Sequence, residues 1–94
     1  MKIDKLVPLL VEAARKSGFT VRTEEGNFRG GQCWFADQRL IILNRRMSME
    51  ERADLLAKIL ATEDIESLYV VPEIRGFIEK YQIADREENN QDDA

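Results

Sequence analysis

The chain has 94 residues, of which 44% are hydrophobic and 34% charged, and its net charge is -4. This length predicts one domain with one core, and the composition is typical of a soluble globular protein. The absence of histidine excludes Ser-His-Asp triads, Cys-His pairs and histidine-based zinc sites, and the single cysteine excludes an internal disulfide and Cys-x-x-Cys motifs. No apolar stretch suits a membrane span or a signal peptide, so we expect a cytoplasmic protein.

The first predicted element is an amphipathic helix over residues 3–17. Its apolar residues recur at the three- and four-residue spacing of one helix face: Ile3, Leu6, Val7, Leu10, Ala13 and Ala14. We expect Asp4 to cap its start and Gly18 to end it in a left-handed conformation. Residues 19–24 then alternate between apolar or threonine side chains and polar ones, which predicts a short, half-buried strand before a turn at residues 25–27.

Residues 31–36 and 39–44 predict a β-hairpin with residues 37 and 38 as its two-residue loop. In that register one face carries Cys33, Phe35, Leu40 and Ile42, and the other carries Trp34, Ile41 and Leu43, with Gln32 and Arg39 at its margins. Both faces are apolar, whereas a sheet with one wet face would alternate apolar and polar residues. We therefore expect two helices over the Cys33 face, and the third helix or a second subunit over the Trp34 face.

Ser48 and Glu51 form a capping-box pattern, which predicts a second helix from Ser48 to about Ala61. The β-branched run at residues 68–71 predicts a fourth strand, and Pro72 then begins a third helix that ends near Gln82. Residues 84–94 are acidic and rich in amides, so we expect a disordered tail. The result is one α+β domain over residues 1–83, with three helices and a small antiparallel sheet of three or four strands in the order α-β-β-β-α-(β)-α.

One passage of the chain, residues 39–62, resembles the strand-to-helix passage of the ImmA/IrrE-type zinc peptidases. In that family a strand that ends near an asparagine leads through a short loop to a helix that carries His-Glu-x-x-His. The corresponding positions here hold Lys58, Ile59 and Thr62. The resemblance therefore implies a peptidase-like core without the metal ligands and general base.

A larger part of the chain is similar to a group of short, uncharacterised bacterial proteins with a Gly-Gly-x-Cys passage near the start and a Pro-x-x-Arg passage near the end. The matching passages are Gly30 to Cys33, Ile41 to Asn44, Glu50 to Arg52, and Asp64 through Tyr69 and Pro72 to Arg75. This resemblance implies a bacterial protein of the same layout. It implies no activity.

Cys33 is the obvious candidate for a reactive residue, because Arg29 or Arg39 could lower the pKa of its thiol. We interpret it instead as a buried strand residue opposite Ile42, because cysteine is often buried and no general base accompanies it. The glycine pair before it, Gly30 and Gly31, indicates a bulge or a close approach of backbones, since a phosphate loop would be followed by a helix rather than a strand.

The two apolar faces of the hairpin favour a non-enzymatic protein that binds a protein partner, or a second copy of itself, through the face formed by Trp34, Ile41, Leu43 and Arg39. The alternative is a degenerate peptidase-like or thiol-dependent enzyme centred on Cys33. The third is single-stranded nucleic-acid binding by Phe28, Trp34 and the arginines at positions 22, 29, 39, 45 and 46, against which stands the lack of any RNA-recognition motif. No motif indicates a catalytic residue, a cofactor, a metal or a membrane.

Overall fold

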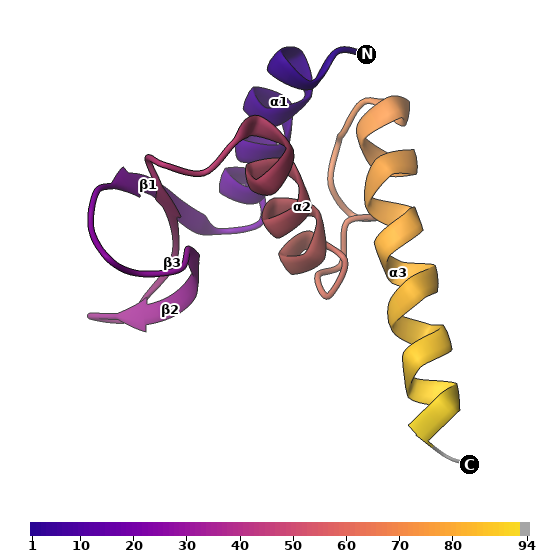
Figure 1. Cartoon of the computed structure of the whole chain (residues 1–94). Coiled ribbons are helices and arrows are strands. Elements are labelled where there is room, and N and C mark those ends of the chain that lie inside the picture. The colour runs from indigo at the N-terminus through magenta and orange to yellow at the C-terminus, as the bar shows by residue number, and fades with distance from the viewer. Residues whose placement is uncertain (93–94) are drawn as a thin grey trace.

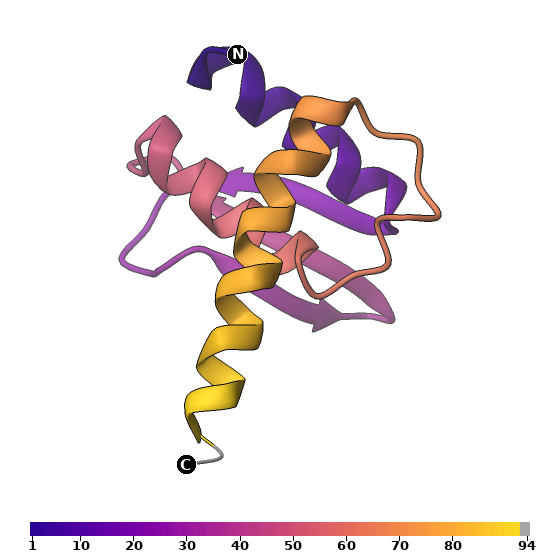
Figure 2. The same ribbon diagram turned by 90° about the vertical axis from the view of Figure 1, so that its right-hand side faces the viewer.

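The computed structural model describes the backbone of residues 1–92 and the side chains of residues 1–83. Over these residues the chain forms six elements: α1 (Ile3–Lys16), β1 (Phe19–Glu24), β2 (Gly31–Phe35), β3 (Gln38–Asn44), α2 (Met49–Leu60) and α3 (Pro72–Asp92). The sheet forms one layer, α1 and α2 lie against it, and α3 packs on the far side of these two helices (Figures 1 and 2). The predicted α+β class and the three helices are confirmed.

The helix α1 buries the face that its periodicity predicts, including Leu10 and Ala14 at 0% exposure. Its N-cap is Lys2, whose side chain makes no capping hydrogen bond, and Asp4 lies in the first turn. The prediction that Asp4 caps the helix is therefore wrong, although its carboxylate still favours the positive end of the helix dipole. Gly18 follows the helix with φ of 98°, which confirms the predicted left-handed stop.

The three strands form a sheet in the order β1-β3-β2. β1 runs parallel to β3, and β2 runs antiparallel to it. The sheet is thus mixed, and the prediction of a purely antiparallel sheet is wrong. The most apolar strand, β3, takes the central position, where it has a neighbour on each side, and this places β1 beside β3 rather than beside β2.

A tight turn joins β2 to β3. Its two loop residues, Ala36 and Asp37, have φ values of 49° and 66°. Positive φ at both positions is the mark of a type I′ turn, whose twist matches that of the flanking strands. The predicted loop at residues 37–38 is therefore one residue too late.

The register of the hairpin follows from this turn. Cys33 pairs with Leu40, not with Ile42, and Trp34 pairs with Arg39, not with Ile41. Moving the loop by one residue changes each pair by two positions, so every side chain keeps its predicted face. The register was wrong and the division into two faces was right.

α1 and α2 cover the face that carries Phe19, Ile41 and Leu43, all of which are buried; we call it the core face. No helix covers the opposite face, which carries Cys33 and Leu40 and which we call the open face (Figure 1). This arrangement reverses the prediction that two helices would cover the Cys33 face.

The reason for the reversal lies in β1. Phe19 and Val21 of this strand stand on the core face, whereas Thr20 and Arg22 stand on the open face. Pairing with β1 therefore adds apolar side chains to one face of β3 and polar side chains to the other. The helices pack where the burial of apolar surface is greater.

The helix α2 begins with the predicted capping box: the backbone N–H of Glu51 donates to Ser48 Oγ at 3.1 Å, and the N–H of Ser48 donates to Glu51 Oε1 at 3.0 Å. α3 packs against α2 and α1 rather than against the sheet (Figure 1), with Ile74 and Ile78 in the core. The sequence predicts the third helix or a second subunit over the Trp34 face of the sheet, and the third helix does not cover it.

Residues 61–71 form no strand, so the predicted fourth strand at residues 68–71 is absent. Side chains satisfy two of the carbonyl groups in this segment: Lys16 Nζ donates to Tyr69 O at 3.0 Å, and Arg75 Nη2 donates to Leu68 O at 3.3 Å. The segment therefore does not depend on a ladder of backbone hydrogen bonds.

α3 is longer than the predicted helix, which ended near Gln82. The disordered tail predicted for residues 84–94 begins within it, because the backbone is helical to Asp92. The side chains of residues 84–92, and residues 93–94 altogether, lie outside the described part of the chain. No helix in the described residues is both long and apolar enough to cross a membrane.

Candidate functional site

The most exposed apolar region of the sheet is the edge strand β2. Its sequence, Gly-Gln-Cys-Trp-Phe, contains no charged residue. Trp34 is 72% exposed and Phe35 is 67% exposed, and the two side chains stand on opposite faces of the sheet. Trp34 belongs to the core face, but β2 is an edge strand and the helices leave this side chain uncovered.

The four residues of the predicted interaction face, Trp34, Ile41, Leu43 and Arg39, do not form one exposed surface. Ile41 and Leu43 are 0% and 2% exposed, because they lie in the core beneath the helices. Arg39 is partly buried and paired with Glu63, which follows α2. Of the four residues, only Trp34 presents most of its side chain to a partner.

Arg39 is held by two neighbours. Its guanidinium donates two hydrogen bonds to the carboxylate of Glu63, from Nη1 to Oε1 at 2.9 Å and from Nη2 to Oε2 at 2.6 Å. Its Cζ atom also lies 4.0 Å from the centre of the Phe19 ring. Because Arg39 donates these hydrogen bonds to the Glu63 carboxylate, the pKa of Arg39 is raised. These contacts give a fixed cation directly across the strands from Trp34.

Cys33 is exposed on the open face, so the prediction of a buried cysteine is wrong. The reason is that no helix covers this face and that Cys33 lies on its edge strand, whereas its partner Leu40 on the central strand is 4% exposed. A hollow of about 560 Å³ at the β2 edge is lined by Gln32, Cys33, Trp34 and Arg39, of which only Cys33 belongs to the open face. Exposure alone predicts rapid reaction with thiol reagents, so such a reaction would not indicate a catalytic thiol.

Asn44, at the end of β3, holds the connection between β1 and β2. It is 7% exposed, and its Nδ2 donates to Gly26 O at 2.9 Å and to Phe28 O at 2.8 Å. Its Oδ1 accepts from the backbone N–H of Arg46 at 3.0 Å. Sequence reasoning gave Asn44 no role, and the only signal was its place at the end of an apolar strand.

Gly30 fixes where β2 begins. A Cβ atom at this position would lie 2.7 Å from Ile42 O and 3.1 Å from the side chains of Leu55 and Met47. This is the close backbone approach that the glycine pair predicts. A Cβ atom on Gly31 would meet nothing within 4 Å, so of the two glycines only Gly30 lies close to a neighbouring backbone.

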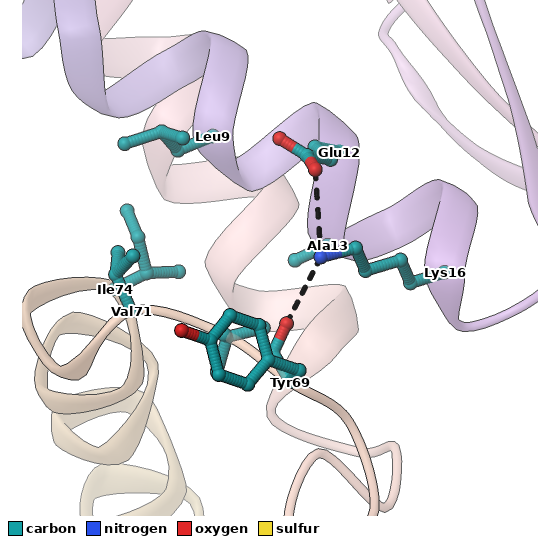
Figure 3. Close-up of a pocket in the computed structure, with 8 residues that line it drawn as sticks. Leu9, Glu12, Ala13, Lys16, Tyr69, Val71 and Ile74 are labelled. Atoms are coloured by element: carbon teal, nitrogen blue, oxygen red, sulfur yellow. Dashed lines mark hydrogen bonds and ion pairs between the residues drawn. The ribbon is translucent and has the colours of Figure 1, made fainter.

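A small cavity between α1 and the start of α3 has a volume of about 120 Å³ (Figure 3). At its mouth Lys16 Nζ bridges Tyr69 O, at 3.0 Å, and Glu12 Oε1, at 3.4 Å. Pockets for small-molecule ligands have volumes of roughly 300–1,000 Å³. The cavity is therefore too small for such a ligand, and its polar groups tie the segment before α3 to α1.

A second hollow, of about 520 Å³, lies beside α2 and the connection that Asn44 holds. Its acidic residues are already engaged: Asp54 forms an ion pair with Lys58 at 2.9 Å, and Glu51 completes the capping box. Polar groups that bind each other in this way give little reason to expect a substrate or an ion.

The residues that would serve nucleic-acid binding, or a degenerate peptidase-like activity, do not come together in one site. Phe28 lines the hollow beside α2, Trp34 lies on the edge strand, and Arg39 is occupied by Glu63, so no single platform unites them. In the passage that resembles the zinc peptidases, Lys58 is ion-paired and Ile59 is buried. Within the described residues, no group of three or more Cys, Asp or Glu side chains is placed to hold a metal ion.

Comparison of the chain with models of protein families, with curated proteins and with solved structures found no match. What the chain does must therefore be inferred from its own geometry.

Proposed function

We propose that this chain is a non-catalytic protein-interaction module whose docking site is the free edge of β2. The observation that carries the proposal is an edge strand without charge that exposes Trp34 on one face and Phe35 on the other. Aromatic side chains of this kind are enriched at the centres of protein interfaces, because they bury a large area at a small cost in side-chain entropy.

The absence of protection along β2 supports this role. Proteins normally guard an edge strand with charged side chains, a proline or a bulge, because an open edge pairs readily with other chains. None of the five residues of β2 is charged or a proline, and β2 pairs with β3 without a bulge. An edge left open in this way fits a strand that has a partner.

The backbone of β2 offers the partner hydrogen bonds. Residues that close a two-residue hairpin loop exchange backbone hydrogen bonds, so the N–H and C=O of Phe35 face β3. Alternation along the strand then directs the backbone groups of Gln32 and Trp34 to the free edge. We expect the partner to add an extended segment there, with side chains that contact Trp34 on one face and Phe35 on the other.

The test is a selection of displayed random peptides on the full chain, with counter-selection on the double variant Trp34→Lys and Phe35→Lys. Lysine is a natural guard of edge strands, and both side chains are largely exposed, so the variant should fold. The control is Ile83→Lys, which places one new lysine charge on α3, away from the sheet, at a side chain that is 53% exposed.

We expect the selected peptides to bind the native chain and the Ile83→Lys control, and to lose binding to the double variant. In amide-exchange NMR they should slow the exchange of Gln32 and Trp34 more than that of Cys33 and Phe35. If no peptide distinguishes the native chain from the double variant, and the native chain does not self-associate, the proposed function is wrong.

A further inference from the structure

We infer that the partner strand at the β2 edge is β2 of a second copy of this chain, in an antiparallel register centred on Cys33. This inference rests on the proposed function and names the occupant of the same site. Pairing of the two edges would join two three-stranded sheets into one continuous sheet across a two-fold axis.

The centre of the register follows from the backbone. The groups that face the free edge belong to Gln32 and Trp34, so a symmetric pairing must match even-numbered positions with each other. A centre at Cys33 sets Gln32 opposite the second copy's Trp34 and also pairs all the residues of the strand Gly31–Phe35. A centre at Gln32 or at Trp34 leaves part of β2 without a partner.

The side chains are complementary in the same register. Phe35 falls opposite Gly31, so a large ring meets a residue without a side chain, and Trp34 falls opposite Gln32. The two Cys33 residues face each other on the axis. Neither aromatic side chain is directly opposite its own copy.

Charges beyond the ends of β2 agree with this arrangement. Arg29 lies two residues before β2, and Asp37 lies two residues after it. Continued beyond the strand, the register centred on Cys33 brings Arg29 of each copy toward Asp37 of the other. Both residues are exposed, so these pairs would favour the antiparallel register over a parallel one, which would bring like charges together.

The size of the contact sets the expected strength. Burying two aromatic side chains removes on the order of 300 Å² of accessible surface per chain from contact with water, since each side chain buries roughly 150–250 Å² when fully covered. A standard stable interface buries roughly 800 Å² per partner. The dimer is therefore weak and forms as the protein concentration rises.

The first experiment is sedimentation velocity of the full chain over a wide concentration range, combined with amide-exchange NMR. We expect a shift from monomer to dimer, with slower exchange of the Gln32 and Trp34 amides at high concentration. The double variant Trp34→Lys and Phe35→Lys should lose the shift, and the Ile83→Lys control should keep it. A native chain that stays monomeric at the highest concentration would overturn the inference.

The second experiment tests the register through the single cysteine. Opposed residues of a pair without mutual backbone hydrogen bonds have Cα atoms about 4.5 Å apart, within the range of roughly 4.4–6.8 Å that a disulfide needs. Oxidised glutathione should therefore link the two Cys33 thiols. Both thiols give up their protons as the new S–S bond forms, and one glutathione disulfide is reduced to two glutathione thiols.

The matched control is the double variant Cys33→Ser and Gln38→Cys, which moves the thiol to an exposed position on the same face of the sheet, in β3, and leaves Phe35 in place. In the proposed register the two new thiols are separated by β2 of both copies and by four positions along the strands, more than roughly 13 Å, which is too far for a disulfide. We expect the native chain to form a linked dimer and this variant to form none. Equal linking of both would show random collision and would overturn the register.

The results separate this inference from the proposed function. Peptide binding at β2 by a chain that remains monomeric would leave the function standing and refute the second copy as partner. Dimers that persist in the Trp34→Lys and Phe35→Lys variant would place the dimer interface elsewhere and refute this inference, and the peptide selection would then decide the proposed function by itself.

Discussion

The two edges of the sheet present opposite surfaces, although both flank the same central strand. Phe19 of β1 and Trp34 of β2 lie in one row across the core face, on either side of Arg39. Phe19 is 4% exposed and Trp34 is 72% exposed. The same type of side chain in the same row is therefore core at one edge and surface at the other.

The open face continues the contrast. β1 places Arg22 and Glu24 there, and charged side chains of this kind discourage pairing with another chain. β2 places Cys33 and Phe35 on this face, both of them exposed. The difference teaches that one edge is guarded by charge and by a helix, and that the other edge is left available.

The largest expected effect separates the two aromatic residues. Phe19→Ala should lower the free energy of unfolding by about 3–5 kcal/mol, because it opens a cavity in the core. Trp34→Ala should lower it by less than about 1 kcal/mol, because the side chain is mostly in water. Urea denaturation at a protein concentration below that of self-association measures both, and equal losses would remove the distinction between the edges.

The glycine pair at the start of β2 should give the next effect. Gly30→Ala forces a Cβ atom against the backbone oxygen of Ile42, and we expect a loss of roughly 1–3 kcal/mol in stability. Gly31→Ala meets open space and should change stability by no more than about 0.5 kcal/mol. Thermal unfolding of the two single variants compares them, and a Gly30→Ala variant as stable as Gly31→Ala would contradict the observed close approach.

Asn44→Ala should lower stability by about 1–3 kcal/mol, since it leaves the carbonyl groups of Gly26 and Phe28 without their donor. Because these carbonyls belong to the connection that leads into β2, we expect amide exchange to accelerate more in β2 than in β1. Uniform acceleration in both strands would show that Asn44 supports the whole sheet rather than one edge of it.

The smallest effect lies away from both edges, where Tyr81 of α3 donates a hydrogen bond to Asp54 Oδ1 at 2.9 Å. Burial, together with this hydrogen bond to the carboxylate, raises the pKa of Tyr81 from 10.0 to about 12. Because the pKa is raised on folding, the neutral phenol contributes its full stabilisation at pH values below 10.0, the ordinary pKa of tyrosine. This contribution is lost as the pH rises from 10.0 to about 12.

Tyr81→Phe should remove that alkaline dependence and cost on the order of 1 kcal/mol at neutral pH. On the acid side, the hydrogen bond from Lys58 holds the pKa of Asp54 below its ordinary value, so its stabilising effect is lost as the pH falls through the folded-state pKa. Neither the Tyr81→Phe substitution nor the protonation of Asp54 should alter the proposed dimerisation through β2. Denaturant midpoints across pH, with sedimentation of the same variant, check both points.

Much of the fold could be predicted because its signals are local. The helical period fixed the buried face of α1, and Ser48 with Glu51 marked the start of α2 through a contact between residues three apart. The assignment of hairpin side chains to two faces was also right, because it depends only on alternation along the strands.

The strand order and the covering of the faces were not predictable in the same way, because they depend on which strand becomes the neighbour of β3. Thr20 and Arg22 make the open face polar only after β1 has paired with β3. The exposure of Cys33 follows from that pairing, which no short window of sequence contains. The sequence thus predicted one residue of the candidate site, Trp34, but not the edge position of β2 or the exposure of the residues beside Trp34.

The turn at Ala36 and Asp37 has a consequence for aggregation. Both residues adopt left-handed φ values without being glycine, and Ala36, which lacks the short polar side chain of asparagine or aspartate, costs on the order of 1 kcal/mol compared with glycine. The hairpin should therefore open locally at this end before the rest of the domain unfolds. When β2 detaches, the backbone edge of β3 from Leu40 to Leu43 becomes exposed. This edge is more apolar than that of β2 and therefore more prone to aggregation. Two residues in a surface turn thus set how often the most aggregation-prone segment of the chain meets solvent.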